Sequence, residues 1–383
     1  MKSQIFSWMI LYAMIAFLLA SCNVSTSTLV PSPEATITPA FTPTNTLPLP
    51  TDTPLVTATN TPVIAPPISL SNFQSLASLY QWNIASDIVK ITGAALSPLA
   101  DKVALLAVRY PEQYSLELYE SQTGNLIWKQ ILDAKADYPA LAFSADGSLI
   151  AVGTGSGNVT VWNVSDGSLS QTLTGTSYAV RAVAFSPDGS LIAAAGSDSM
   201  IQVWQVSDGT VRTAYAVKVN VGKLVFSPDS RYLAMASDIF AVYDLTSGNH
   251  SPVIYYAGIA PHPTAEILFS SDSRSLITEG ELNDANHNTW IPRILVWNLS
   301  SNRDATIKVP IPDVIQNMVV LPDGRSVLGY DASKGQLDAI DIPGKSVTGT
   351  VDLGTILFMD YSKNLSRFMI VTQASVAIWG VSP

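Results

Sequence analysis

Residues 141–167 read LAFSADGSLIAVGTGSGNVTVWNVSDG, residues 183–209 read VAFSPDGSLIAAAGSDSMIQVWQVSDG, and residues 224–248 read LVFSPDSRYLAMASDIFAVYDLTSG. Each stretch holds a short apolar strand, a tight turn that contains Asp, and a second apolar strand. A third strand follows, which ends in an aromatic and a polar residue before a Gly turn. Self-similarity at a period of roughly 40 residues is typical of architectures in which each repeat forms one small structural unit. These three copies therefore decide the fold.

The same pattern continues on both sides of the three copies. Gly or Asn follows the aromatic position by five residues in most units, as these residue types accept the left-handed backbone of a tight turn. Seven units are visible between about residues 75 and 383, and Ile340 replaces the aromatic residue in one of them. In the other units the third strand ends on Tyr119, Trp162, Trp204, Tyr243, Trp297 and Trp379.

The FSPDG turn at 185–189 and the pair Trp204-Gln205, followed by Gly209, resemble the WD-repeat (WD40-like) β-propeller family. The resemblance covers about residues 75–383, and Tyr243-Asp244 comes nearest to the Trp-Asp dipeptide of that family. It implies an all-β, seven-bladed β-propeller with four-stranded antiparallel blades. By analogy with the fold, the expected function is non-catalytic docking of another protein or a peptide.

The two ends of the repeat region complement each other. The last unit stops at its third strand, because only 380–383 follow Trp379. Leu76–Ile84 (LASLYQWNI) is a surplus strand before the first unit. Because a blade built from both termini leaves no unpaired edge at the seam, we expect Leu76–Ile84 to pair with Val376–Trp379. The alternative is that Leu76–Ile84 is only an apolar approach to the domain.

The first 22 residues resemble a bacterial lipoprotein signal peptide. Lys2 precedes an apolar run at 5–19, which has the length of a secretory signal and is short for a membrane span. Leu19-Ala20-Ser21-Cys22 resembles a lipoprotein processing box, which implies lipid on Cys22 and an extracytoplasmic location on the cell envelope membrane. An uncleaved signal anchor is the alternative. Since Cys22 is the only cysteine, we expect no disulfide.

Residues 23–67 form a low-complexity segment rich in Thr and Pro, whose only charges are Glu34 and Asp52. Nothing in it is patterned to bury an apolar face, so we expect a disordered, extended tether. Glycosylation of the tether stays open.

The composition limits the classes of partner. A formal net charge of −10 argues against binding to nucleic acid, which needs Lys and Arg to replace counterions along the phosphates. We expect a monomer that contacts the membrane through its lipid anchor.

Catalytic motifs are weak in this sequence. The histidines His250, His262 and His287 have no metal-ligand spacing, and no G-x-S-x-G turn follows a strand. We therefore predict no catalytic residues, metal or cofactor. The expected channel positions, which show no carboxylate cluster, are Ala140, Arg181, Gly222, Lys223, Thr264, Asn317 and Thr355.

Two alternative functions stay open. One is a propeller enzyme, either a lactonase, a hydrolase or a quinoprotein-like oxidoreductase. Glu120–Trp128 (ESQTGNLIW) resembles an element of quinoprotein-type propellers, although a structural role of the turn and its Trp is the simpler interpretation. The other is a carbohydrate or small-ligand binder at the central depression.

The docking hypothesis points to loops at one rim of the propeller. The segment Glu279–Arg293 (EGELNDANHNTWIPR) is the longest insertion and is expected to be an acidic loop, whose binding role stays open. The loops Arg109–Tyr114 and Asp133–Tyr138 should lie on the same rim. Tyr, Trp and Arg dominate interface energetics, although ordinary loop packing would also explain these residues. The candidate binding residues are Tyr114, Tyr138, Tyr178, Arg181 and Trp290.

Overall fold

The computed structural model describes residues 65–132, 135–138, 140–175, 178–237, 239–249, 252, 254–256, 266–284, 289–300, 307–311 and 315–381. The chain divides into two units, Met1–Thr59 and Asn60–Pro383, and the described residues belong to the second. The predicted signal peptide, Cys22 and residues 23–64 of the predicted tether lie outside the described residues. Among the residues that are described, no helix is long and apolar enough to span a bilayer.

The strands form seven four-stranded antiparallel sheets, which we number as blades from the N-terminus. The first blade contains β2 (Ile88–Leu96), β3 (Lys102–Arg109), β4 (Gln113–Glu120) and β5 (Leu126–Ile131). The second contains β6 (Leu141–Phe143), β7 (Leu149–Gly153), β8 (Val159–Asn163) and β9 (Leu169–Leu173). The third contains β10 (Val180–Phe185), β11 (Leu191–Gly196), β12 (Met200–Gln205) and β13 (Val211–Ala216).

Three further blades follow the same order. The fourth contains β14 (Lys223–Phe226), β15 (Tyr232–Ala236), β16 (Phe240–Asp244) and β17 (Ile254–Tyr256). The fifth contains β18 (Ile267–Phe269), β19 (Ser275–Asp284), β20 (Thr289–Asn298) and β21 (Ile307–Pro310). The sixth contains β22 (Ile315–Val320), β23 (Ser326–Asp331), β24 (Gln336–Asp341) and β25 (Ser346–Asp352).

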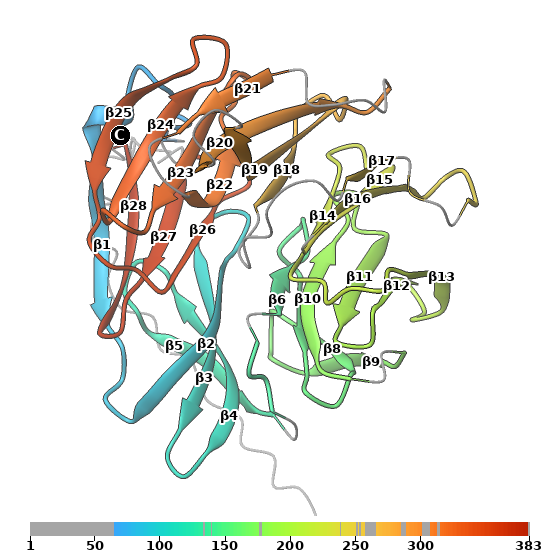
Figure 1. Ribbon diagram of the computed structural model, residues 1–383. Helices are drawn as coiled ribbons and strands as arrows, with labels where there is room; N and C mark the ends of the chain where they lie inside the picture. The colour runs from blue at the N-terminus through green and yellow to red at the C-terminus, as the bar shows by residue number, and fades with distance from the viewer. Residues whose placement is uncertain are drawn as a thin grey trace, which may run out of the picture. The chain divides into compact units, whose positions relative to one another are not determined.

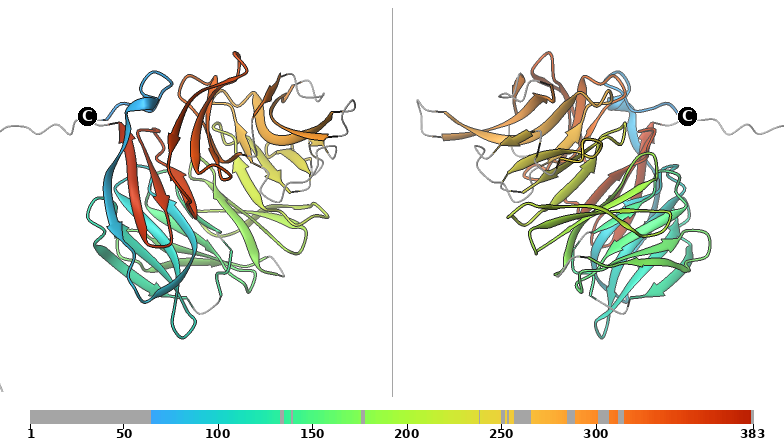
Figure 2. Two further views of the ribbon diagram at one scale, coloured as in Figure 1. Left: turned by 60° about the vertical axis from the view of Figure 1, so that its left-hand side comes forward. Right: turned by 90° about the vertical axis from the view of Figure 1, so that its right-hand side faces the viewer.

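The seventh blade combines strands from both ends of the repeat region. It contains β26 (Phe358–Tyr361), β27 (Arg367–Val371), β28 (Ser375–Val381) and, on its outer side, β1 (Leu76–Asn83). In the β1–β28 pair, Ser78 lies opposite Trp379 and Trp82 lies opposite Val376. Figures 1 and 2 show the N-terminal strand alongside the C-terminal strand. The predicted closure of the ring is therefore confirmed.

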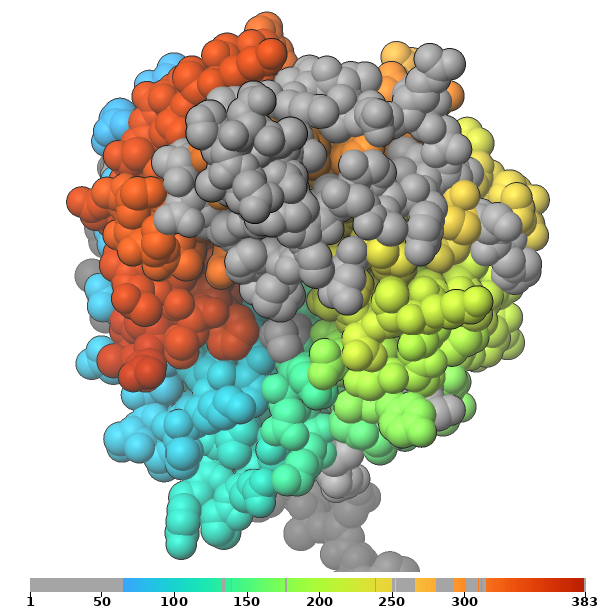
Figure 3. Space-filling model, viewed as in Figure 1, coloured from blue at the N-terminus to red at the C-terminus, as the bar shows by residue number. Residues whose placement is uncertain are grey.

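The innermost strand of each blade contacts the innermost strand of the next. This series of contacts runs through β2, β6, β10, β14, β18, β22 and β26, and β26 contacts β2 again. A cyclic series of this kind defines a propeller, so the predicted all-β fold with seven blades is confirmed. The space-filling view shows the cyan first blade and the green second and third blades as neighbouring parts of one surface (Figure 3).

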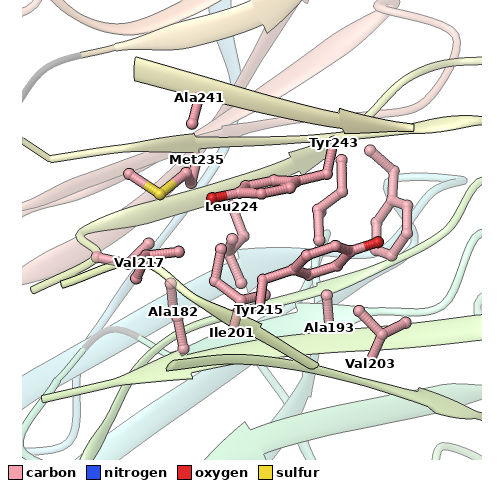
Figure 4. Close-up of a cluster of buried hydrophobic side chains, with 14 of the residues drawn as sticks. Ala182, Ala193, Ile201, Val203, Tyr215, Val217, Leu224, Met235, Ala241 and Tyr243 are labelled. Carbon is pink, nitrogen blue, oxygen red and sulfur yellow. The ribbon is translucent and has the colours of Figure 1, made fainter. Parts of the chain in front are cut away.

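The repeated aromatic residue packs between blades. Tyr243, at the end of the third strand of the fourth blade, lies with its ring centroid 4.3 Å from that of Tyr215 on β13 (Figure 4). Both side chains are buried in a cluster that also contains Ile201, Leu224 and Met235, from two adjacent sheets. Burying an aromatic side chain of this size contributes about 2–3 kcal/mol, which explains why the position repeats.

The repeated Ser-x-Asp turn closes the first hairpin of the second, third, fourth and fifth blades. In the third blade the buried Ser186 hydroxyl donates to Asp188 Oδ1 at 2.5 Å and accepts the Leu191 N–H at 2.9 Å. Ser144 and Ser227 make the same bonds in their own blades. The turn motif is therefore a structural element that replaces backbone hydrogen bonds at the end of the strand.

The segment Glu120–Trp128 has a structural role, because its Trp makes a hydrogen bond that recurs between neighbouring blades. The indole Nε1 of Trp128 on β5 donates to the Val164 carbonyl in the second blade at 2.8 Å. Trp82 on β1 makes the equivalent bond to the Ser121 carbonyl in the first blade at 3.3 Å. These tryptophans therefore join the outer strand of one blade to the next blade.

The insertion at Glu279–Arg293 differs from its prediction. It is not a long loop, because β19 and β20 continue into it and pair as far as Asp284 and Thr289. The Glu279 side chain is buried rather than solvated. Each of these two strands is ten residues long, and they pair along their whole length, so the insertion lengthens the hairpin. Residues 285–288, which include His287, lie outside the described residues.

Residues that precede β1 also pack on the propeller. Ile68 and Phe73 are buried in a cluster formed with the sixth and seventh blades. The Ile68 N–H donates to the Leu365 carbonyl at 2.9 Å. The short 3₁₀ helix η1 (Phe73–Ser75) then leads into β1.

Candidate functional site

The propeller has two faces, which differ in their connections. Because neighbouring strands are antiparallel, the turns after the first and third strands of a blade lie at one end, here called the turn face. It includes 97–101, 144–148 and 186–190. The connections after the second and fourth strands lie at the other end, here called the loop face, which includes 110–112 and 135–138.

On the loop face, the first blade is joined to the connection that leads into the second. The Tyr114 hydroxyl donates to Asp137 Oδ1 at 2.5 Å, and this hydrogen bond raises the pKa of Tyr114. Nearby, Lys135 Nζ and Glu112 Oε1 form an exposed ion pair at 2.7 Å. The two loops predicted to share a rim therefore do so.

The same connection reaches the third blade. Arg181 Cζ lies 4.6 Å from the centre of the Tyr138 ring, and Arg181 Nη2 donates to the Tyr138 hydroxyl at 3.1 Å. The buried Nε of Arg181 has no hydrogen-bond partner within the described part of the chain. A cation over an aromatic face is stabilised by about 0.5–2 kcal/mol, so this contact holds both side chains in place.

Two tyrosines on this face are well exposed. The exposed fraction is 61% for Tyr178, three residues before Arg181, and 87% for Tyr110, between β3 and β4. Four of the predicted rim residues therefore lie on connected segments of the first three blades. The fifth, Trp290, lies on β20, but its side chain is outside the described part of the structure.

A buried ion pair that sequence reasoning missed lies beneath this rim. Glu117, in the middle of β4, is fully buried and accepts two hydrogen bonds of 2.8 Å from Arg109. Burial opposes ionisation, but hydrogen bonds from Arg109, Tyr119 and Ser115 outweigh it and lower the pKa of Glu117. Arg109 also pairs with Asp87, just before β2. The one signal in the sequence is a Glu within the apolar strand SLELY.

On the turn face, the central channel opens into a cavity of about 410 Å³. Most of its lining residues are apolar and lie at the ends of the innermost strands, for example Phe143, Phe185 and Phe226. A carboxylate, Asp360 on β26, also lines it. Asp360 accepts the Leu96 N–H at 2.8 Å across the seam between the seventh and first blades. We call this space the turn-face cavity.

Enclosure by protein changes the ionisation of Asp360. Its partly exposed surface faces the cavity rather than open solvent, and burial raises its pKa to about 6. Sequence reasoning placed the channel positions at the starts of the innermost strands, and Asp360 lies near the end of one. It was missed for that reason.

The described channel positions lie at or near the starts of innermost strands, as predicted: Ala140 precedes β6 and Arg181 is the second residue of β10. Lys223 begins β14 and forms an ion pair with Glu266 of the fifth blade, whereas Asn317 lies inside β22. Thr264 lies outside the described residues. Within the described ranges, no group of three His, Cys, Asp or Glu side chains is placed to hold a metal ion.

Comparison with known families agrees with this geometry. Residues 135–163 and 167–205 match the family model "WD domain, G-beta repeat", and the matches correspond to the second and third blades. The domain is a β-propeller in which two blades match WD repeats.

Solved structures show the same fold. A chain in the "Crystal Structure of Mitotic Checkpoint Complex" is 14% identical to this propeller, with a TM-score of 0.64. The alignment covers 80% of this chain and 96% of that chain. At this level of identity, the likeness concerns the fold alone. No curated protein matches the chain closely enough to count as a relative.

Proposed function

We propose that this chain is a lipid-anchored, extracytoplasmic propeller that acts as a non-catalytic docking scaffold for another protein or an extended peptide. The propeller fold and the sequence of residues 1–67 support this proposal together. The lipid on Cys22 would hold the chain at the membrane, and the Thr/Pro-rich tether would hold the propeller away from it.

The observation that carries the docking role is the rim of the first three blades. Exposed Tyr110 and Tyr178 lie there on a frame fixed by the Arg181–Tyr138 and Tyr114–Asp137 contacts. Tyr and Arg are enriched among residues that dominate binding energy. Because the frame is already ordered, little side-chain entropy is lost when a partner binds.

The alternative of a propeller enzyme has less support. A catalytic centre in a pocket needs polar groups that converge on one point. The turn-face cavity is lined mostly by apolar residues, with Asp360 as its carboxylate. This lining favours contact with a partner over chemistry at the channel.

The docking role is tested by recovery of a partner from detergent-solubilised membranes. We expect Tyr110→Ala, Tyr178→Ala and Arg181→Ala each to lower recovery at least tenfold, which corresponds to about 1.4 kcal/mol. Leu169→Ala is the matched control, because Leu169 is 50% exposed on the outer strand β9, away from the rim. Equal recovery from all four variants would remove this surface from the proposal.

The anchor is tested separately. We expect Cys22→Ala to abolish metabolic labelling with a fatty-acid analogue and to shift the chain out of the membrane fraction. Ser25→Ala, three residues into the tether, is the control and should behave as the unaltered chain. If the Cys22→Ala chain remained lipid-labelled, the lipoprotein assignment would fail.

A further inference from the structure

The turn face carries an uneven distribution of charge around the mouth of the turn-face cavity. In the second and third blades its turns present four exposed carboxylates: Asp146, Asp166, Asp188 and Asp208. The basic residues of these two blades are Arg181, on the loop face, and Arg212, on the outer strand β13. The turns of these two blades therefore form an acidic sector of the turn face, whose neighbouring cation is Lys363 of the seventh blade.

In the next three blades, the charge of the turn Asp is balanced by a basic residue within the same turn motif. Two residues after the turn Asp, the fourth, fifth and sixth blades carry Arg231, Arg274 and Arg325. The second and third blades carry Ser148 and Ser190 at that position. The acidic sector is therefore not a simple consequence of the repeat, because the motif accepts a basic residue two positions after the turn Asp.

These carboxylates stay charged at neutral pH. The hydrogen bond from the Ser144 hydroxyl, together with those from Ser148, lowers the pKa of Asp146. The Ser168 and Thr210 backbone N–H groups do the same for Asp166 and Asp208. Hydrogen bonds inside each turn thus hold a negative charge at a fixed place on the surface.

The mouth of the turn-face cavity is also held in shape. The Lys363 N–H donates to the Pro98 carbonyl at 3.0 Å, and its Nζ donates to the Ala145 carbonyl at 3.4 Å, so turns of three blades are joined. The Asp188 N–H donates to the Ser230 hydroxyl at 3.1 Å, which joins the third and fourth blades. An apolar side chain that enters here meets a preformed cavity.

We propose that the turn face is a second docking surface, for a protein segment that inserts an apolar or aromatic side chain into the turn-face cavity and places Lys or Arg beside it over Asp146 and Asp188. Charge complementarity argues for this occupant, since both carboxylates flank turns that line the cavity. The proposal does not rest on the loop-face rim.

Other occupants fit less well. A second copy of this chain has a formal net charge of −10, and the segment 23–67 carries only Glu34 and Asp52 as charged residues. Both would be repelled by the exposed carboxylates in the turns of the second and third blades. The partner is therefore a different, basic protein segment.

The test uses the full-length chain, immobilised in mild detergent, and a phage-displayed library of random peptides. We expect the selected peptides to combine Lys or Arg with an aromatic or aliphatic residue. A labelled consensus peptide should bind the Asp146→Asn/Asp188→Asn variant at least tenfold more weakly, and added salt should weaken its binding to the unaltered chain. Selection of no peptide, or of peptides without basic residues, would overturn the proposal.

A second pair of variants separates insertion from simple charge attraction. Ala145→Trp, on an exposed turn at the cavity mouth, should block insertion and reduce binding at least tenfold while thermal unfolding stays unchanged. Arg181→Ala, on the loop face, should bind the consensus peptide normally, which distinguishes this proposal from failure of the rim. If spermine displaced the peptide and Ala145→Trp bound it fully, the surface would be a site for polycations only and the proposal would be wrong.

Discussion

At the scale of single residues, Asp360 is a carboxyl group whose surroundings disfavour its charge. Its folded-state pKa of about 6 lies above the ordinary value of 3.8, so the folded chain holds the proton more tightly than the unfolded chain. This contribution to stability is therefore complete below about pH 4 and is lost as the pH rises through 6. The carboxyl oxygens accept the N–H groups of Leu96 and Tyr361, and the amide of Asp360→Asn can accept only one of them. Because this variant cannot ionise, its stability relative to the unaltered chain should improve by about 1–2 kcal/mol between pH 4.0 and pH 7.5.

Urea unfolding of both chains at pH 7.5 and pH 4.0 checks this expectation. The stability of Asp360→Asn relative to the unaltered chain should be lower at pH 4.0, because the unaltered carboxyl is then largely protonated in the folded chain. A difference that is the same at both pH values would show that ionisation of Asp360 is not its cause.

The buried Glu117 gives a second residue-scale prediction. Arg109→Met removes two of the hydrogen bonds that hold the Glu117 charge and should destabilise the fold by about 3–5 kcal/mol. Replacing both partners, in Arg109→Met/Glu117→Leu, should restore much of this loss, because no buried charge then remains. Chemical denaturation measures the free energy of unfolding of both variants. A double variant less stable than the single one would contradict this prediction.

These two residues also show where sequence reasoning stops. Glu117 and Asp360 sit in strands whose pattern is apolar, and neither forms part of a recognisable motif. Their roles depend on neighbours distant in the chain, such as Leu96, which is 264 residues from Asp360. A linear pattern carries no information about such contacts. The rim residues could be predicted more readily, because aromatic residues in the loops between strands are visible in the sequence.

At the scale of elements, the turn after the third strand is constrained in two ways. Gly167 has a φ of +71°, and a Cβ added there would lie 2.8 Å from Trp128 Cδ2 of the preceding blade. Gly248, in the same turn of the fourth blade, has a φ of +65° but no described atom within 4 Å of such a Cβ. The outer-strand Trp therefore explains why some of these positions need Gly more strictly than others.

The two glycines make a matched pair. Gly248→Ala should cost about 1 kcal/mol, the strain of a left-handed alanine, whereas Gly167→Ala should cost about 2–4 kcal/mol because it also displaces Trp128. Thermal unfolding measured side by side provides the comparison. Equal losses would mean that the contact between Trp128 and the turn contributes nothing beyond backbone strain.

Elements that follow the repeat could be predicted from the sequence, and the exception could not. The turns at Ser144, Ser186 and Ser227 formed as expected, because each depends on residues within its own hairpin. The aromatic strand ends pack on the neighbouring blade, and their regular spacing made them visible in the sequence. The insertion 279–293 has no counterpart in the other units, so nothing in the repeat indicated that β19 and β20 would extend. The burial of Glu279 follows from that extension.

At the scale of the whole molecule, closure of the ring depends on the seam in the seventh blade. β1 covers the outer side of β28, and Trp82 on β1 stacks on Tyr119 of the first blade at 4.9 Å between ring centroids. The closing strand therefore belongs to two interfaces at once. Both proposed docking faces require a closed ring, because an open ring would separate the blades that form them.

The most direct measurement is disulfide formation across this seam. Gln81 lies opposite Ala377, so Gln81→Cys/Ala377→Cys, in a chain with Cys22 replaced by Ser, should form a disulfide rapidly under mild oxidation and migrate faster on non-reducing gels. Gln81→Cys/Val376→Cys, shifted by one residue, should not, since neighbouring strand residues point to opposite faces. Equal cross-linking of both pairs, or none of the first, would contradict ring closure by β1.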